Sequence, residues 1–372
     1  MSQILVVSKP FAPPWRDSSK NLARELVRAA TATRFRVLTP PGLRLPFDHV
    51  VTEGVYRHAG RFEPGLLQNL RVLARLLQPA QADLIHFFFA PSARTARAAR
   101  LALSLPGRRL PTVQTVCSLP VDGLAVRPGL FADATVVLSR YAQQRLLAEG
   151  VAGVHCIAPA VRAAPWPSPR RRQRLRRLLG LVDGPVVLFA GDLEPARGAA
   201  TLIEAVPALR AALPDIQVVI AARAKTPATR VHARELNDRV NRLGAASCVR
   251  FVGEVRHMRA WLAAADVQVL VARSLEKKMD YPLVLLEGLA RGLPVVVSDR
   301  PPLSEILELA PGAGRRVAPD DPEALAHAVA TLLDDSTALD AARHAAHRGV
   351  RAFSPALMAE RYVDLYRSLL PA

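Results

Sequence analysis

A single glutamate stands inside an apolar segment in the second half of the chain. Glu287 lies among the leucines of the helix-forming run 283–290, and Gly292-Leu293-Pro294 then ends the helical pattern. A carboxylate is poorly suited to a protein core, but it can accept hydrogen bonds from the two vicinal hydroxyl groups of a ribose. The pattern therefore predicts a nucleotide-binding carboxylate, and the alternative is that Glu287 faces solvent.

The first half carries polar and aromatic groups that suit a second site. Ser18 and Ser19 begin a helix-forming segment, where hydroxyl groups either cap the helix or bind an anion. His86 ends an apolar strand pattern, and it is either a catalytic or acceptor-binding group or a core histidine with satisfied hydrogen bonds. Trp15 either stacks on an acceptor or packs inside the protein. The candidate acceptor-binding residues are Trp15, Arg16, His86 and Cys117.

Short apolar runs alternate with helical patterns and would position these residues. In the first half we expect strands at 4–8, 35–39, 84–88, 112–116, 134–138 and 154–157, and a helix at 21–29. In the second half we expect strands at 185–191, 216–221, 249–252, 267–271 and 294–298, and helices at 198–212, 229–243, 257–264 and 283–290. This alternation is typical of βαβ units and parallel sheets.

The pattern predicts an α/β protein with two Rossmann-like, doubly wound parallel-sheet domains that face each other across a cleft. Ligands bind such folds at the carboxyl ends of the strands. We expect an N-terminal domain at 1–162, a proline- and arginine-rich linker at 163–184 and a C-terminal domain at 185–350. A C-terminal helix at 351–372 would pack back on the N-terminal domain.

The composition agrees with two folded domains and shows an uneven charge. The chain has 372 residues, of which 50% are hydrophobic, so it can bury a sizeable core. Its net charge is +18, and residues 1–182 hold 27 basic and 9 acidic residues, whereas residues 183–372 hold 23 of each. Codon bias in a GC-rich genome would explain many arginines, but it would act on both halves equally.

The cysteines and the N-terminus indicate a reducing compartment. Three cysteines, Cys117, Cys156 and Cys248, match no metal-binding spacing and are expected to be buried, reduced thiols. No apolar run approaches the length of a membrane span, and the start of the chain has no signal-peptide pattern. We expect a cytoplasmic protein, with peripheral contact to the inner face of the cell membrane allowed.

Residues 277–298 resemble a known signature. They are similar to the segment of retaining GT-B glycosyltransferases ("glycosyl transferases group 1") in which Glu, seven residues and a second Glu precede Ala-Met-Ala-x-Gly-x-Pro-Val-Val. Three further stretches resemble the same family in order and spacing, namely 191–205, 249–267 and 315–326. The resemblance is strong over about 185–335 and weaker in the first half.

The resemblance implies transfer of a sugar from a UDP- or GDP-type nucleotide sugar, with no cofactor and no metal. Glu287 matches the family glutamate that holds the donor ribose, and Arg197 matches the lysine that neutralises the departing diphosphate. Retention implies a same-face displacement in which the protein mainly stabilises the leaving group. The residues that the resemblance assigns to catalysis are Arg197, Lys278 and Asp280. The expected donor-binding residues are Glu287, Arg197, Arg223, Lys225, Lys277, Tyr281, Leu283, Ser18 and Ser19.

Three departures distinguish this sequence from the family pattern. Met279 occupies the first glutamate position, so Asp280 or a main-chain amide must replace its contact to the sugar. Asp192 replaces an arginine that reaches the phosphates, and Lys277, Lys278, Arg223 or Lys225 would compensate for it. The first turn, Pro13-Pro14-Trp15-Arg16-Asp17-Ser18-Ser19, lacks the usual pair of glycines.

The basic first half suits an anionic partner. Arg94, Arg97 and Arg100 recur every three residues on one expected helix, and Arg71 and Arg75 lie on another. Either these arginines form a solvated face or they contact an anionic membrane surface or an anionic acceptor, such as a lipid phosphate or an acidic polysaccharide. No nucleic-acid-binding motif is present, so nucleic acid is the weaker alternative.

These observations together predict a retaining, metal-independent glycosyltransferase of glycolipid, polysaccharide or cell-envelope synthesis. A non-catalytic sugar-nucleotide-binding or scaffold protein of the same fold is the alternative, because of Met279 and Asp192. An inverting transferase or an epimerase is the third.

Overall fold

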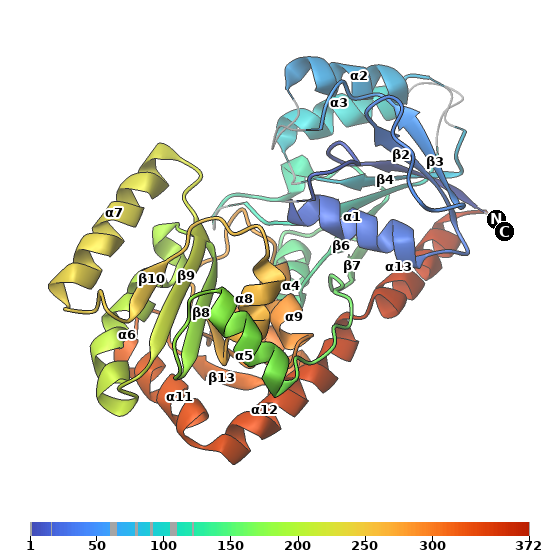
Figure 1. The fold of residues 1–372 in the computed structure, drawn as a ribbon. Helices are drawn as coiled ribbons and strands as arrows, with labels where there is room; N and C mark the ends of the chain where they lie inside the picture. The colour runs from blue at the N-terminus through green and yellow to red at the C-terminus, as the bar shows by residue number, and fades with distance from the viewer. Residues whose placement is uncertain are drawn as a thin grey trace. The chain divides into compact units, whose positions relative to one another are not determined.

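The chain is divided between two compact units, each built on a parallel β-sheet (Figure 1). The computed structural model describes residues 2–15, 17–59, 65–78, 81–89, 92–104, 110–120 and 123–371. Unit 1 comprises Met1–Ala160, Glu276–Pro282 and Phe353–Ala372, and unit 2 comprises Val161–Leu275 and Leu283–Ala352. Unit 1 is therefore assembled from three separate stretches of sequence.

Unit 1 has a seven-stranded sheet in the order β3-β2-β1-β4-β5-β6-β7, and neighbouring strands run parallel. Its strands are β1 (Gln3–Val7), β2 (Arg34–Thr39), β3 (Val50–Gly54), β4 (Leu84–Phe88), β5 (Thr112–Val116), β6 (Ala134–Val137) and β7 (Val154–Cys156). Its helices are α1 (Ser18–Ala29), α2 (Leu66–Leu76), α3 (Ala93–Leu103), η1 (Arg127–Gly129), α4 (Arg140–Ala148) and α13 (Pro355–Leu369). The strand order reverses between β1 and β4, which makes this a doubly wound sheet.

Unit 2 has a six-stranded sheet in the order β10-β9-β8-β11-β12-β13, again with parallel neighbours. Its strands are β8 (Val186–Asp192), β9 (Gln217–Arg223), β10 (Val249–Phe251), β11 (Val267–Leu270), β12 (Val295–Ser298) and β13 (Gly314–Val317). Its helices are α5 (Pro169–Leu178), η2 (Pro195–Arg197), α6 (Ala199–Ala212), α7 (Pro227–Arg242), α8 (Met258–Ala264), α9 (Leu283–Leu289), α10 (Leu303–Leu309), α11 (Pro322–Asp334) and α12 (Ser336–Gly349), followed by η3 (Val350–Phe353).

The expected α/β class with two doubly wound parallel sheets is confirmed. The sequence missed β3 and β13, which are edge strands of the two sheets. An edge strand of this kind lacks the continuous apolar run of a central strand: β13 carries two exposed arginines in its middle, and β3 is only half-buried. Residues 163–184 were expected as a linker, and the structure includes them in unit 2, where Pro169–Leu178 form α5.

A buried histidine anchors the C-terminal helix in unit 1. His86, in the middle of β4, is fully buried, and hydrogen bonds join its Nδ1 to the Tyr366 hydroxyl (2.6 Å) and its Nε2 to Thr115 Oγ1 (2.7 Å). Thr115 also shares a hydrogen bond of 3.0 Å with the Tyr362 hydroxyl. Because Tyr362 and Tyr366 are spaced by four residues, they lie on one face of α13, which packs against α1.

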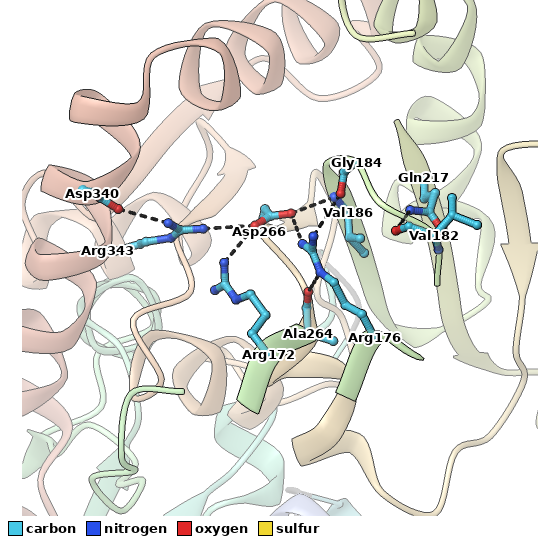
Figure 2. Close-up of polar contacts among 10 residues, drawn as sticks. All are labelled: Arg172, Arg176, Val182, Gly184, Val186, Gln217, Ala264, Asp266, Asp340 and Arg343. Carbon is cyan, nitrogen blue, oxygen red and sulfur yellow. Dashed lines mark hydrogen bonds and ion pairs between the residues drawn. The ribbon is translucent and has the colours of Figure 1, made fainter. Parts of the chain in front are cut away.

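A buried aspartate anchors α5 and α12 at the start of β8 in unit 2. Figure 2 shows Asp266 between three arginines: Arg172 and Arg343 donate to Oδ1 at 2.9 and 3.0 Å, and Arg176 donates to Oδ2. The Val186 amide also donates to Oδ2, at 2.9 Å. Burial lowers the pKa of Arg172 to about 10, although Asp266 favours its charged form. The arginine-rich stretch is therefore partly structural, because two of its members are fixed to the core of unit 2.

Acidification is expected to destabilise unit 1 through His86. Burial lowers the pKa of His86 well below its ordinary value, so the folded state keeps it neutral while the unfolded chain becomes protonated. The unfolded state thus binds more protons below pH 6.5, and this group should reduce the free energy of unfolding by about 1.4 kcal/mol between pH 7.5 and 5.5. Urea denaturation at both pH values measures this change. His86→Gln should lose this part of the pH dependence; an unaltered dependence in the variant would contradict the assignment.

Asp266→Asn is expected to destabilise unit 2 by about 3–5 kcal/mol. The substitution keeps the size of the side chain but leaves three partly buried guanidinium groups without their shared anion. The change is measured as the free energy of unfolding in urea. The matched control is Asp340→Asn, which removes an exposed carboxylate from Arg343 and should cost less than about 1 kcal/mol. Equal losses in the two variants would show that the buried cluster is not a special anchor.

Candidate active site

The most informative site residues of unit 2 follow two neighbouring strands at the point where the strand order reverses. Strand β8 lies between β9 and β11 in the sheet, and the chain winds in opposite directions on its two sides. Arg197 comes shortly after β8, and Glu287 lies in α9, which follows β11. Ligands of open α/β sheets bind outside the carboxyl ends of the strands at such a reversal. The topology therefore brings the two predicted donor-binding residues to the same edge of the sheet.

Arg197 is held firmly in this edge. It ends the short helix η2 and is 6% exposed. Its guanidinium donates to Glu194 Oε2 from Nε (3.0 Å) and from Nη2 (2.8 Å), and its Nη1 donates to the carbonyl oxygen of Ser274. A guanidinium fixed by several partners loses little freedom when an anion approaches. Glu194 and Ser274 are thus positioning partners that the sequence did not identify, although Glu194 stands only three residues before Arg197.

The backbone after Arg197 approaches the neighbouring strand very closely. Gly198 has φ +84°, and a Cβ atom placed there would lie 2.5 Å from the carbonyl oxygen of Val271. Both the left-handed conformation and the missing side chain are therefore required at this position. The glycine fixes where the start of α6 meets Val271, the residue after β11, and it thereby fixes where Arg197 lies.

Asp192, at the end of β8, pairs with two of the predicted donor-binding cations. Arg223 Nε donates to its Oδ1 at 3.2 Å, and Lys225 Nζ donates to its Oδ2 at 3.0 Å. The sheet explains the contact, because Asp192 and Arg223 are directly paired in β8 and β9. Arg197, Arg223 and Lys225 together outnumber Asp192 and Glu194 by one positive charge. Asp192 thus offsets part of the positive charge that Arg223 and Lys225 bring to the ends of β8 and β9.

Glu287 lies in the short helix α9 and is half-buried. Leu285, Leu286 and Leu289 are fully buried on the same helix, whereas Leu283, another predicted donor-binding residue, is only half-buried at its start. Arg291 donates to the Glu287 carbonyl oxygen at 2.6 Å, and burial lowers its pKa although Glu287 favours its charge. The half-buried position agrees with neither a core carboxylate nor a fully solvated one.

The segment that carries Met279 packs in unit 1. Met279 and Asp280 are buried, and Asp280 Oδ2 accepts a hydrogen bond of 2.6 Å from Ser139, the residue that caps α4. Tyr281 is buried against Phe353, with ring centroids 5.9 Å apart. The structure thus gives Asp280 and Tyr281 packing partners in unit 1. Lys278 is half-buried and Lys277 is exposed, and the Lys277 amide donates to the Leu119 carbonyl oxygen at 3.0 Å.

In unit 1, an aspartate and two lysines organise the first turn after β1. Asp17 caps α1 by accepting from the Lys20 amide at 3.1 Å, and it also pairs with Lys9 at 2.8 Å and binds the Ser19 hydroxyl. Burial alone would raise the pKa of Asp17, but Lys9 and the hydrogen bonds lower it overall. Lys20 Nζ is buried and donates to the Ala12 carbonyl oxygen at 2.6 Å. Lysine and aspartate side chains thus support the turn that lacks the glycine pair. Ser18, the first residue of α1, is exposed.

The predicted acceptor-binding residues are not brought together by the described contacts. His86 is bound at both ring nitrogens inside the unit, in the middle of β4 rather than at its end, so the geometry supports a core role. Trp15 packs edge-on against Phe11 (5.4 Å) and lies under the Arg24 guanidinium (4.6 Å). Burial raises the pKa of the Cys117 thiol, which is therefore uncharged. Arg16 lies outside the described residues.

This chain is similar to known glycosyltransferases in sequence and in fold. Residues 184–335 match the family model "Glycosyl transferases group 1". The solved structure of Anabaena HepE in complex with UDP-glucose superposes with a TM-score of 0.77 at 18% identity, covering 99% of this chain and 100% of that chain. The chain has the GT-B fold.

Two curated relatives are glycosyltransferases. A GDP-mannose-dependent alpha-(1-6)-phosphatidylinositol monomannoside mannosyltransferase of Mycolicibacterium smegmatis is 28% identical over 334 residues, which is 87% of this chain and 80% of the relative. A D-inositol 3-phosphate glycosyltransferase of Jonesia denitrificans is 33% identical over 156 residues, 39% of this chain, and the match spans only 35% of its length. These matches support a glycosyltransferase of the GT-B type.

Gly198→Ala is expected to destabilise the protein more than Gly244→Ala, by at least about 2 kcal/mol. Both glycines have positive φ, so both variants are strained, but only a Cβ at position 198 meets backbone atoms, whereas one at position 244 meets nothing within 4 Å. Urea unfolding of the two variants isolates the cost of the close approach between Gly198 and Val271. Similar free energies of unfolding would mean that this approach is not rigid.

Proposed function

We propose that this protein transfers a sugar, with retention of configuration and without a metal, from a UDP- or GDP-sugar to an acceptor in glycolipid, polysaccharide or cell-envelope synthesis. The observation that carries the proposal is the placement of Arg197 and Glu287 at the strand-order reversal of unit 2. They follow neighbouring strands, and both lie within the residues that match the family model. The charge and hydrogen-bonding capacity of the two side chains suit a nucleoside diphosphate sugar.

Each residue has a distinct task in the proposed reaction. Glu287 accepts hydrogen bonds from the ribose hydroxyl groups and so holds the donor before and during transfer. Arg197 stabilises the negative charge that builds up on the diphosphate as the bond to the sugar breaks. Since Glu194 and the Ser274 carbonyl hold its guanidinium in place, little reorganisation is needed at that moment. Arg223 and Lys225 outnumber Asp192, and the positive charge that remains at the ends of β8 and β9 attracts the diphosphate from solution.

A lipid-linked or otherwise anionic acceptor fits the composition of unit 1. Residues 1–160 of unit 1 hold 20 basic and 9 acidic residues, and its two later stretches, 276–282 and 353–372, are each neutral overall. The Mycolicibacterium smegmatis relative acts, by its name, on phosphatidylinositol monomannoside. We therefore place the acceptor of this chain among molecules that carry a phosphate or another acid. No helix in the described part of the chain has the length and apolar character needed to cross a bilayer.

A non-catalytic sugar-nucleotide-binding protein is the second candidate, and two observations favour it. Met279 offers no hydrogen bond to a sugar and is buried in unit 1. Asp192 pairs with Arg223 and Lys225, which reduces the charge available to a diphosphate. A binder of this kind retains Glu287 and Arg197 but releases no nucleoside diphosphate.

Two substitutions test the donor site. Glu287→Ala should weaken nucleotide-sugar binding by about 10- to 100-fold, because hydrogen bonds to a charged partner are lost. Arg197→Ala should lower the turnover number by about 100-fold and the affinity much less, because its charge matters most as the diphosphate departs. Isothermal titration with a panel of UDP- and GDP-sugars measures binding, and release of nucleoside diphosphate measures turnover. Glu323→Ala and Arg210→Ala, on exposed positions of α11 and α6, are the matched controls.

The outcomes separate the candidates. Near-normal binding and turnover in Glu287→Ala would overturn its role. Binding without release of diphosphate, tested with and without acceptor lipid extracts, would favour the non-catalytic binder. NMR analysis of the product anomer separates retention from inversion, and turnover that persists in EDTA is expected for a metal-independent enzyme.

A further inference from the structure

Helices α2 and α3 of unit 1 expose large apolar side chains to solvent. Leu66, Leu67 and Leu70 on α2 are 76%, 73% and 50% exposed, and Leu101 on α3 is 72% exposed. We call these four residues the leucine face. Single exposed leucines are common on proteins, but four on two helices that contact each other are not, and such patches mark interaction sites.

The leucine face is not needed to hold the two helices on the sheet. The opposite faces do this: Val72 and Leu76 of α2 and Leu103 of α3 all pack against one buried cluster that includes Leu5 and Phe87. Because the inner faces of both helices rest on the same cluster, their outer faces turn away from it together. Figure 1 shows α2 and α3 lying beside each other. The leucine face is thus a surplus apolar surface on a supported platform.

Exposed arginines accompany the leucines. Arg94, Arg97 and Leu101 are spaced by three and four residues, so they share one face of α3, and all three are exposed. Arg71 is exposed next to Leu70 on α2. Neither helix contains an acidic residue.

Two of the arginines predicted for an anionic contact have other partners. Arg75 pairs with Glu53, and Arg100 Nη2 donates to the Leu130 carbonyl oxygen at 2.6 Å. Arg71, Arg94 and Arg97 are therefore the cations best placed for an external partner.

We propose that α2 and α3 dock this protein on an anionic lipid bilayer, with the leucine face inserted among the acyl chains and Arg71, Arg94 and Arg97 on lipid phosphates. Charge complementarity selects this occupant, since a basic rim around apolar side chains matches an anionic headgroup layer over hydrocarbon. A nucleic acid would use the arginines but offers nothing to the leucines. A second copy of the chain would bring the same arginines face to face, and their repulsion opposes that contact.

Vesicle sedimentation of the full chain tests the proposal. Vesicles of phosphatidylglycerol and phosphatidylcholine should pellet the protein, and vesicles of phosphatidylcholine alone should bind it much more weakly. Replacing Arg71, Arg94 and Arg97 with Gln should lower the partition coefficient at low salt by about 100-fold, or roughly fivefold for each arginine. Replacing the four leucines with Gln should abolish the binding that persists at high salt, where electrostatic attraction is screened.

Matched controls use equally exposed residues elsewhere. The apolar control replaces Leu147, Leu178, Val182 and Val231, which are 51% to 73% exposed, with Gln. The charge control replaces Arg230, Arg234 and Arg242 of α7 with Gln, all of which are exposed. Both controls should bind vesicles as the original protein does, and circular dichroism checks that every variant folds.

Any of the following three results would overturn the proposal. Equal binding by the leucine variant and the original protein would remove the leucine face from the contact. Absence of vesicle binding, with a dimer in sedimentation velocity that the leucine variant abolishes, would assign the face to a second copy. Absence of vesicle binding, with salt-dependent binding to DNA, would assign the arginines to nucleic acid. The assay contains no nucleotide sugar, so its failure would leave the donor-site proposal standing, and the reverse also holds.

Discussion

One carboxylate with four hydrogen-bond donors ties unit 2 together. Asp266 accepts hydrogen bonds from the guanidinium groups of Arg172, Arg176 and Arg343, which lie on α5 and α12. It also accepts one from the Val186 amide at the start of β8. The strand so fixed ends at Asp192 and leads directly to Arg197. The position of Arg197, the proposed donor-binding arginine, at one end of β8 thus depends on a charge cluster at the other end. Removing one partner of such a cluster is costly because the remaining charges stay buried without it, whereas replacing the whole cluster by apolar residues is often neutral.

The sequence predicted the sheets because their central strands are buried on both faces. Continuous apolar runs such as Val186-Val187-Leu188-Phe189-Ala190 are typical of strands buried on both faces of a parallel sheet, and their alternation with helical patterns predicts the βαβ units of a doubly wound fold. The edge strands β3 and β13 escaped this logic, since one side of an edge strand is open and polar residues are tolerated. Glu287 and Arg197 were identified from motifs, and the topology places them at one sheet edge.

What the sequence did not predict were contacts between residues far apart in the chain. The sequence showed that Asp192 removes a positive charge from the phosphate-binding pattern. It did not show that Asp192 pairs with Arg223 and Lys225, because that contact follows from the strand register, which no local pattern reveals. The arginines of α5 were expected in a linker, and no local pattern showed that Asp266, about 90 residues later, binds two of them. His86 was expected at the end of its strand, either as an acceptor-binding or catalytic group or as a core histidine. The local sequence could not decide, because its partner Tyr366 is 280 residues away.

The division of unit 1 among three stretches of sequence has a consequence for synthesis in the cell. Helix α13, whose tyrosines complete the hydrogen bonds of His86, comprises residues 355–369 of a 372-residue chain. A ribosome that has released only the first 160 residues has therefore produced an unfinished core with an uncovered histidine and aromatic groups. Unit 2 lies within residues 161–352, before α13, so it can complete its fold before unit 1 although its synthesis starts later. Completion of the unit 1 core must await the synthesis of α13, and a nascent chain stalled before this helix would be a substrate for chaperones.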